Sequence, residues 1–189
     1  MSARISLFIA FSLFFLNASK AQISYSVLQV GGNLGFANEG YKGAFSGFTG
    51  HFVFGKNFQE RAYLGLGIGN EIFKGDYRTN DPHAADQLTM KYDYSVFPIF
   101  VDGRLPFGEV GQGDSKIGVL ANAGYAPAIG QRYDKGFLFK GGFFYLWDNP
   151  RGVDFTASLM YGYQQLTKNF YQKDFQHQHI ALSVGIMLK

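Results

Sequence analysis

An alternation of apolar residues with small or polar ones recurs along the chain, and it restricts the fold more than any other feature. The final stretch shows it most clearly, because apolar side chains occupy every second position: Ile180, Leu182, Val184, Ile186 and Leu188. A period of two residues is typical of a β-strand with two different faces. No segment beyond the first twenty residues sustains the 3.6-residue period of a helix. The sequence therefore predicts an all-β protein.

Eight segments carry this alternation, which predicts an eight-stranded antiparallel up-and-down barrel. The expected strands are residues 24–36, 43–54, 62–73, 88–104, 116–127, 137–147, 153–166 and 178–188. The connections at 55–59 and 148–152 are short, whereas those at 74–87, 127–136 and 167–177 are longer and polar. An even number of strands places both ends of the barrel domain on the same side, together with the short turns.

The first 21 residues have the pattern of a secretory signal peptide. Arg4 precedes an apolar run from Ile5 to Leu16, and the small residues Ser19 and Ala21 follow. That run is shorter than the roughly 20 residues that a membrane-spanning helix needs. We therefore expect a signal peptide at 1–21 and a single barrel domain at 22–189. Without Arg4 and Lys20, the 17 basic residues drop to 15 against 14 acidic ones, so a nucleic acid partner is not expected.

The polar faces of the strands indicate that the barrel has its apolar side outward. Charged residues make up only 16% of the chain, against a norm of roughly 25%. Most of the polar positions hold small uncharged residues, as in Gln29, Gly31, Asn33 and Gly35, which suit the narrow bore of an eight-stranded barrel. An apolar exterior belongs in lipid, where an open sheet edge would leave costly unpaired backbone groups. The sequence thus predicts a closed transmembrane barrel whose outer wall contacts outer-membrane lipid.

Aromatic residues collect near both sets of strand ends, as expected where amphipathic rings meet lipid headgroups. We interpret seven of them as interface aromatics. Those near one set of ends are Tyr25, Phe54, Tyr145 and Trp147, and those near the other are Phe36, Tyr92 and Tyr133.

The fourth segment contains an apparent change of parity. Before Pro98, the apolar positions are even-numbered, as at Tyr92 and Tyr94, but after it they are odd-numbered, as at Ile99 and Val101. Because proline cannot donate a ladder hydrogen bond, a β-bulge at Phe97 and Pro98 would account for the change.

Charged residues on the polar faces are predicted to form an ion-pair network inside the bore, or in part to lie at its wet rim. Three are acidic and three are basic, and an unpaired buried charge is very costly. Glu71 and Lys91 are the most plausible pair, because their strands are neighbours. The full set comprises Glu71, Lys91, Asp93, Asp102, Arg104 and Lys140.

The chain resembles the small outer-membrane β-barrel proteins of the OmpX-like, OmpA-barrel and PorT-like group. The resemblance covers about residues 22–189 and is carried by the signal peptide, the strands rich in glycine and aromatic residues, and the segment Tyr94-Ser95-Val96-Phe97-Pro98-Ile99. Unlike many such barrels, the chain ends in Met187-Leu188-Lys189 rather than in an aromatic residue. The resemblance implies a fold and an outer-membrane location, but not one activity.

No catalytic, metal-binding or cofactor-binding constellation stands out in the sequence, and cysteine is absent. We therefore expect a non-enzymatic barrel without a cofactor, with a plugged bore, acting as a structural or accessory subunit of an outer-membrane complex. A protein partner would bind loops 74–87, 127–136 or 167–177, or the barrel wall. One alternative is an outer-leaflet lipid-modifying enzyme using His179 near Ser183, and another is a secreted lipocalin-like barrel that binds a ligand.

Overall fold

The computed structural model describes residues 23–79, 89–111, 115–149, 153–167 and 174–189. The predicted signal peptide lies outside these residues, as do residues 80–87 and 168–173 of two of the predicted contact loops. Among the described residues, no helix is long and apolar enough to cross a bilayer.

Ten hydrogen-bonded strands form one antiparallel sheet. Eight positions around the ring make up the wall, because β5 and β6 follow one another along β4, and β2 is a two-residue strand beside the end of β1. The strands are β1 (Ile23–Asn38), β2 (Tyr41–Lys42), β3 (Ser46–Phe58), β4 (Ala62–Thr79), β5 (Met90–Val96), β6 (Ile99–Val110), β7 (Ser115–Ala126), β8 (Gly136–Trp147), β9 (Val153–Thr167) and β10 (Asp174–Leu188).

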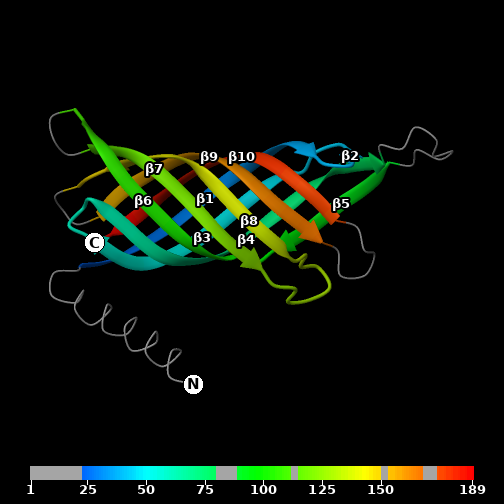
Figure 1. Ribbon diagram of the computed structural model, residues 1–189, viewed down its shortest axis with the longest axis horizontal. Helices are drawn as coiled ribbons and strands as arrows, with labels where there is room; N and C mark the ends of the chain where they lie inside the picture. Colours follow the sequence, from blue (N-terminus) through cyan, green and yellow to red (C-terminus); the bar gives the residue numbers. More distant parts are fainter. Residues whose placement is uncertain (1–22, 80–88, 112–114, 150–152, 168–173) are drawn as a thin grey trace, which may run out of the picture.

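The ring closes between the first and last strands. β1 pairs with β10 from Ser26↔Leu188 to Asn38↔His177, and this ladder closes the sheet into a ring. Figure 1 shows the strands tilted around an elongated barrel, with the C-terminus at the same end as the β3–β4, β6–β7 and β8–β9 connections. The eight-stranded antiparallel barrel predicted from the alternation is confirmed.

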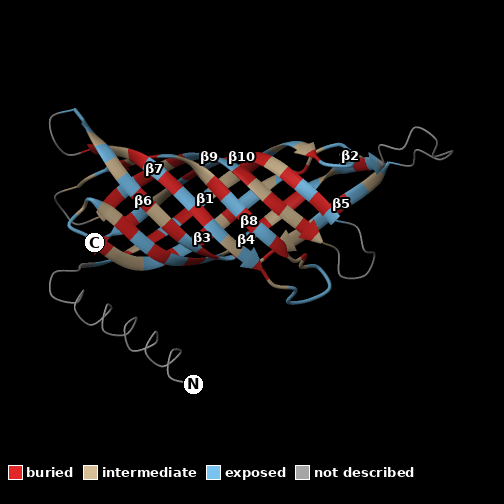
Figure 2. Cartoon of the chain, in the orientation of Figure 1, coloured by how far each residue is buried: buried red, intermediate tan, exposed pale blue. Residues whose placement is uncertain are grey.

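The burial pattern shows an apolar exterior around a partly polar interior. Buried and exposed residues alternate along each strand of the wall and give the chequered pattern of Figure 2. Outward-facing Leu66 and Leu182 are 67% and 60% exposed, whereas inward-facing Glu71 and Arg104 are fully buried. This is the reverse of a water-soluble protein, where charges face solvent and apolar side chains fill the core.

The predicted bulge at Phe97 and Pro98 is wrong. The β4 pairings Glu71↔Val96 and Ile68↔Ile99 are separated by three residues on both strands, so no residue is inserted between them. The β4 ladder is interrupted between β5 and β6 without a change of register. The carbonyl of Pro98 still accepts a hydrogen bond from the amide of Gly69 at 3.2 Å. Even-numbered residues point inward on both sides of the proline. What changes is their chemistry, from Tyr92 and Val96 to Asp102 and Arg104.

The register shifts lie elsewhere, at two phenylalanines. Phe36 is the extra residue of β1 opposite β10, between Gly35 and Ala37. Phe107 is the extra residue of β6 opposite β7, between Pro106 and Gly108. Both rings are more than half exposed on the outer wall. Each irregularity lies near one end of its strand, where bulges are common.

Two of the predicted interface aromatics point into the bore instead. Tyr25 and Tyr92 are each 1% exposed, because their positions have inward parity. Phe36, Phe54 and Trp147 do face outward with 53–62% exposure. Tyr145 is half-buried beside Trp147, and Tyr133 is half-buried in the β7–β8 connection. The aromatic residues near the strand ends thus form two groups: some lie on the outer wall, and others pack inside the barrel.

Candidate functional site

The interior of the barrel is the most unusual chemical environment in the molecule, because it places full charges between apolar layers. One apolar cluster includes Tyr25, Leu146 and Met187, which lie toward the end that holds the C-terminus. The other includes Phe45 and Phe175, toward the opposite end. Two ion-pair centres lie in the bore together with these clusters.

The first centre is built around the carboxylate of Glu71 on β4. The ammonium group of Lys140, from β8, donates to Glu71 Oε1 at 2.6 Å. The imidazole Nε2 of His51 lies 2.9 Å from the same oxygen, and the side-chain amide of Asn33 donates to Oε2 at 3.2 Å. All four side chains are buried. Three polar partners thus replace the water that this carboxylate loses on folding.

The second centre pairs Asp102 with Arg104, two residues apart on β6. The guanidinium group donates from Nε to Asp102 Oδ1 at 2.9 Å and from Nη2 to Oδ2 at 3.3 Å. The hydroxyl of Tyr25 donates to Oδ1 at 3.3 Å, and the amide of Asn122, turned to donate, reaches Oδ2 at 3.1 Å. Arg104 also lies over the ring of Phe144, with its central carbon 5.9 Å from the ring centroid.

Gln29 joins the two centres into one network. Its side-chain oxygen accepts a hydrogen bond from Arg104 Nη2 at 3.1 Å, and its nitrogen lies 3.3 Å from His51 Nδ1. The network holds two acidic side chains, Glu71 and Asp102, and two basic ones, Lys140 and Arg104. A balanced, hydrogen-bonded set of charges can remain buried, whereas a single unpaired charge would be very costly.

The structure places two of the six predicted interior charges outside the bore. Lys91 and Asp93 are exposed on the outer face of β5, because the inward parity of this strand is even-numbered. Asp93 lies 3.3 Å from Lys74, and both side chains are about two-thirds exposed. The expected pair of Glu71 with Lys91 is therefore wrong. Lys91 lies opposite Asp76, and Glu71 is paired with Lys140 instead.

The residues considered for a lipid-modifying enzyme do not form a nucleophile–base pair. The hydroxyl of Ser183 lies 2.7 Å from that of Ser158. Neither ring nitrogen of His179 has a hydrogen-bond partner among the described residues. His179 instead stacks on His177, with the ring centroids 5.2 Å apart and an 18° angle between the planes.

Aromatic side chains fill the end of the bore opposite the C-terminus, and the β7–β8 connection is fixed beside them. The rings of Phe45 and Tyr92 stack at 4.1 Å, and the hydroxyl of Tyr92 donates to Asp134 at 2.6 Å. Ser95 on β5 donates its amide to the carbonyl of Arg132 at 3.0 Å and accepts from the amide of Asp134 at 2.9 Å. The predicted contact loop at 127–136 is thus bound to the barrel through its second half.

A second set of ion pairs surrounds Lys189 at the other end, and we call it the C-terminal rim. The ammonium group of Lys189 lies 2.8 Å from Asp154, 3.3 Å from Glu60 and 3.4 Å from Asp148. Lys116 also donates to Glu60. Burial opposes the charge on Lys189, but the hydrogen bond to Asp154 and the nearby carboxylates raise its pKa above the ordinary value. The hydrogen bond from Lys116 lowers the pKa of Glu60.

The lowered pKa of Glu60 predicts a small loss of stability in acid. A carboxylate with a depressed folded-state pKa adds stability above its unfolded value of about 4.3, and this contribution disappears as the pH falls through the folded pKa. Because Glu60 is partly exposed, we expect at most about 1 kcal/mol. Chemical unfolding between pH 3 and 7 should show a shallower acid loss for Glu60→Gln than for the wild type. Equal pH slopes would contradict this contribution.

Three members of the interior network, His51, Gln29 and Asn33, are additional to the charges predicted from sequence. All three have inward parity on β1 or β3: the alternation places Gln29 and Asn33 in the bore, and the same pattern on β3 could have placed His51 there. The contact between Lys140 and Glu71 could not be predicted in the same way, because these residues lie on β8 and β4, which are not neighbours. Contacts across the bore depend on the stagger of the whole barrel.

Comparison with known proteins identifies the fold but no family. No family model matches the chain, and no curated protein sequence matches it. The crystal structure of Neisserial surface protein A (NspA) is similar, with a TM-score of 0.57 over 90% of this chain and 99% of that chain. Sequence identity is 13%, so the similarity concerns the fold alone.

Proposed function

We propose that this chain is an integral outer-membrane β-barrel protein that acts without catalysis, as a structural or accessory component of the outer membrane. The observation that carries the proposal is the inverted distribution of polarity, with an apolar outer wall around buried ion pairs. The fold similarity to a Neisserial surface protein supports the same location. The end with the C-terminal rim would face the periplasm, and the opposite end the outside.

Fractionation tests the membrane location. We expect the mature protein in the outer-membrane fraction, extracted only by detergent, with different electrophoretic mobility before and after boiling. The apolar wall requires lipid or detergent to cover it. Recovery in the soluble fraction without detergent would refute the proposal and favour a secreted ligand-binding barrel.

We also propose that the bore is plugged, so that the barrel forms no diffusive pore. Glu71, Arg104 and Lys140 are fully buried in the interior, and eight-stranded barrels are just wide enough for their side chains. Purified protein reconstituted into a planar bilayer should give negligible conductance. A steady open channel would contradict the plugged bore.

An accessory role would depend on surfaces that reach beyond the bilayer. The best candidate is the loop at 127–136, because its attachment to Ser95 and Tyr92 gives it a fixed shape that a partner could recognise. The connections at 74–87 and 167–177 and the barrel wall are further candidates. Affinity purification after mild solubilisation should recover a stoichiometric partner. Loss of that partner on replacing residues 128–131, with the barrel still folded, would assign the contact to this loop.

A further inference from the structure

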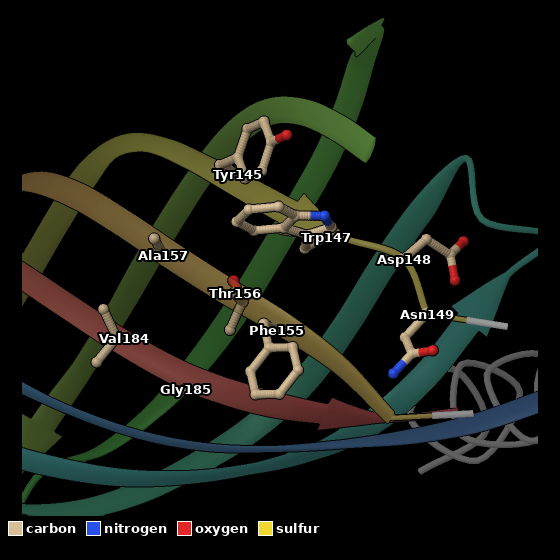
Figure 3. A pocket seen from close by; sticks show the side chains of 9 residues that line it. All are labelled: Tyr145, Trp147, Asp148, Asn149, Phe155, Thr156, Ala157, Val184 and Gly185. Carbon is tan, nitrogen blue, oxygen red and sulfur yellow. The ribbon is translucent and has the colours of Figure 1, made fainter. Parts of the chain in front are cut away.

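A groove interrupts the outer wall near the C-terminal rim. It crosses β8, β9 and β10 and encloses about 670 Å³. Figure 3 shows the rings of Tyr145, Trp147 and Phe155 around it, with Ala157 between them and Val184. Tyr145 and Trp147 meet edge to face, with centroids 6.0 Å apart. Away from Asp148 and Asn149, the groove is lined mainly by apolar groups.

The groove exists because a small residue stands in a row of large ones. The outward positions of β9 hold Phe155, Leu159 and Tyr161, but the position between the first two is Ala157. Ala157 lies directly between Tyr145 of β8 and Val184 of β10 in the register of the sheet. The missing side-chain volume leaves a depression between the neighbouring strands, of a kind that an acyl chain can fill by dispersion contacts.

The end of the groove nearest the rim is polar and acidic. Asp148 and Asn149 follow Trp147 directly and line this end. The ion pairs of the C-terminal rim join three carboxylates, Glu60, Asp148 and Asp154, to the two ammonium groups of Lys116 and Lys189. This set carries one negative charge in excess. Burial raises the pKa of Asp148, so its carboxylate would gain from another cation.

We propose that the groove binds a phospholipid of the periplasmic leaflet, with one acyl chain along Ala157 and a primary ammonium headgroup beside Asp148. This inference rests on the proposed membrane location. Trp147 lies between the apolar groove and the acidic end, where an indole ring is favoured at a membrane interface. A lipid with an ammonium headgroup would balance the negative charge in excess among these five described side chains, whereas an anionic headgroup would add to it.

Trp147 gives a direct measurement, because it is the only tryptophan of the chain. The mature protein is placed in phosphatidylcholine vesicles that contain a small fraction of brominated lipid, which quenches nearby indole fluorescence. Brominated phosphatidylethanolamine is compared with brominated phosphatidylcholine and brominated phosphatidylglycerol at equal fractions. We expect an apparent preference of about two- to fivefold for phosphatidylethanolamine, in the range of a partly exposed ion pair.

Two variants with matched controls assign this preference to the groove. Ala157→Leu should abolish it by filling the depression, whereas Ala123→Leu, at an exposed position of β7, should leave it unchanged. Asp148→Asn should abolish the headgroup preference, whereas Glu39→Gln, which removes an exposed carboxylate in the turn after β1 at the opposite end of the barrel, should not. None of these side chains belongs to the interior network.

The possible results of these experiments distinguish failure of the proposed lipid site from failure of the proposed membrane location. Equal quenching by the three brominated lipids in the wild type would overturn the lipid site and leave the membrane barrel standing. A preference that survives both Ala157→Leu and Asp148→Asn would also overturn it. Absence of quenching in vesicles made wholly of brominated phosphatidylcholine would overturn the proposed membrane location, because Trp147 would then lie outside the bilayer.

Discussion

Replacing Lys140 by methionine is expected to destabilise the barrel by about 3–5 kcal/mol, the range for breaking a buried ion pair by removing one partner. The ammonium group of Lys140 lies 2.6 Å from Glu71, and both side chains are fully buried. Among the described residues, the variant leaves the carboxylate with the hydrogen-bond partners His51 and Asn33. Urea unfolding of the protein in lipid vesicles measures the loss of stability. The transition is monitored by the difference in electrophoretic mobility between folded and unfolded chains.

A double-mutant cycle separates the pair from the lysine alone. The variant Glu71→Gln/Lys140→Met removes both charges and should recover most of the lost stability, because no unpaired carboxylate remains. Lys74→Met serves as a control, since its pair with Asp93 is about two-thirds exposed and should contribute less than about 1 kcal/mol. Zero coupling between positions 71 and 140 would show that the interior pair does not contribute to stability.

The second large effect is expected on the outer wall, where Leu182→Arg should cost about 2–4 kcal/mol in a bilayer. Leu182 is 60% exposed and lies between Leu159 of β9 and Gly32 of β1, near the middle of the wall. A charge at this depth would lose its hydration without gaining a partner. In a soluble barrel the same substitution on an exposed position would be nearly neutral.

Ile129→Arg is the matched control for Leu182→Arg. Ile129 is 53% exposed but belongs to the loop that follows β7, beyond the wall. If the outer wall faces lipid, Ile129→Arg should leave the unfolding midpoint almost unchanged while Leu182→Arg lowers it. Similar small effects of both variants would argue against burial of the wall in a membrane.

The fold could be predicted because each strand of the wall separates an apolar face from a polar or tightly packed one. The apolar residues Leu28 and Val30 of β1 and the alternate residues from Leu182 to Leu188 of β10 face outward, as the alternation predicts. The prediction of a bulge at Pro98 was wrong because it assumed that the inner face of the strand is polar along its whole length. Near the end opposite the C-terminus, the bore is filled by aromatic packing around Phe45 and Phe175, so Tyr92 is apolar and also inward-facing.

The members of the interior site were easier to predict than their partners. Glu71, Asp102, Arg104 and Lys140 have inward parity, which the sequence displays directly. The choice of Lys91 as partner for Glu71 used only the neighbour relation of two strands. Lys140 is 69 residues from Glu71 along the chain, and their contact depends on strand tilt and stagger, which single-strand patterns do not contain.

The pairing of β1 with β10 also determines how such a chain can reach its final state. The ladder that closes the ring joins residues 26–38 to residues 177–188, so its two partners are the first and the last strand of the barrel. A chain without β10 would expose two long rows of unpaired amide and carbonyl groups, which lipid cannot satisfy. Stable insertion therefore requires β10, and we expect the barrel to enter the bilayer as a whole rather than hairpin by hairpin.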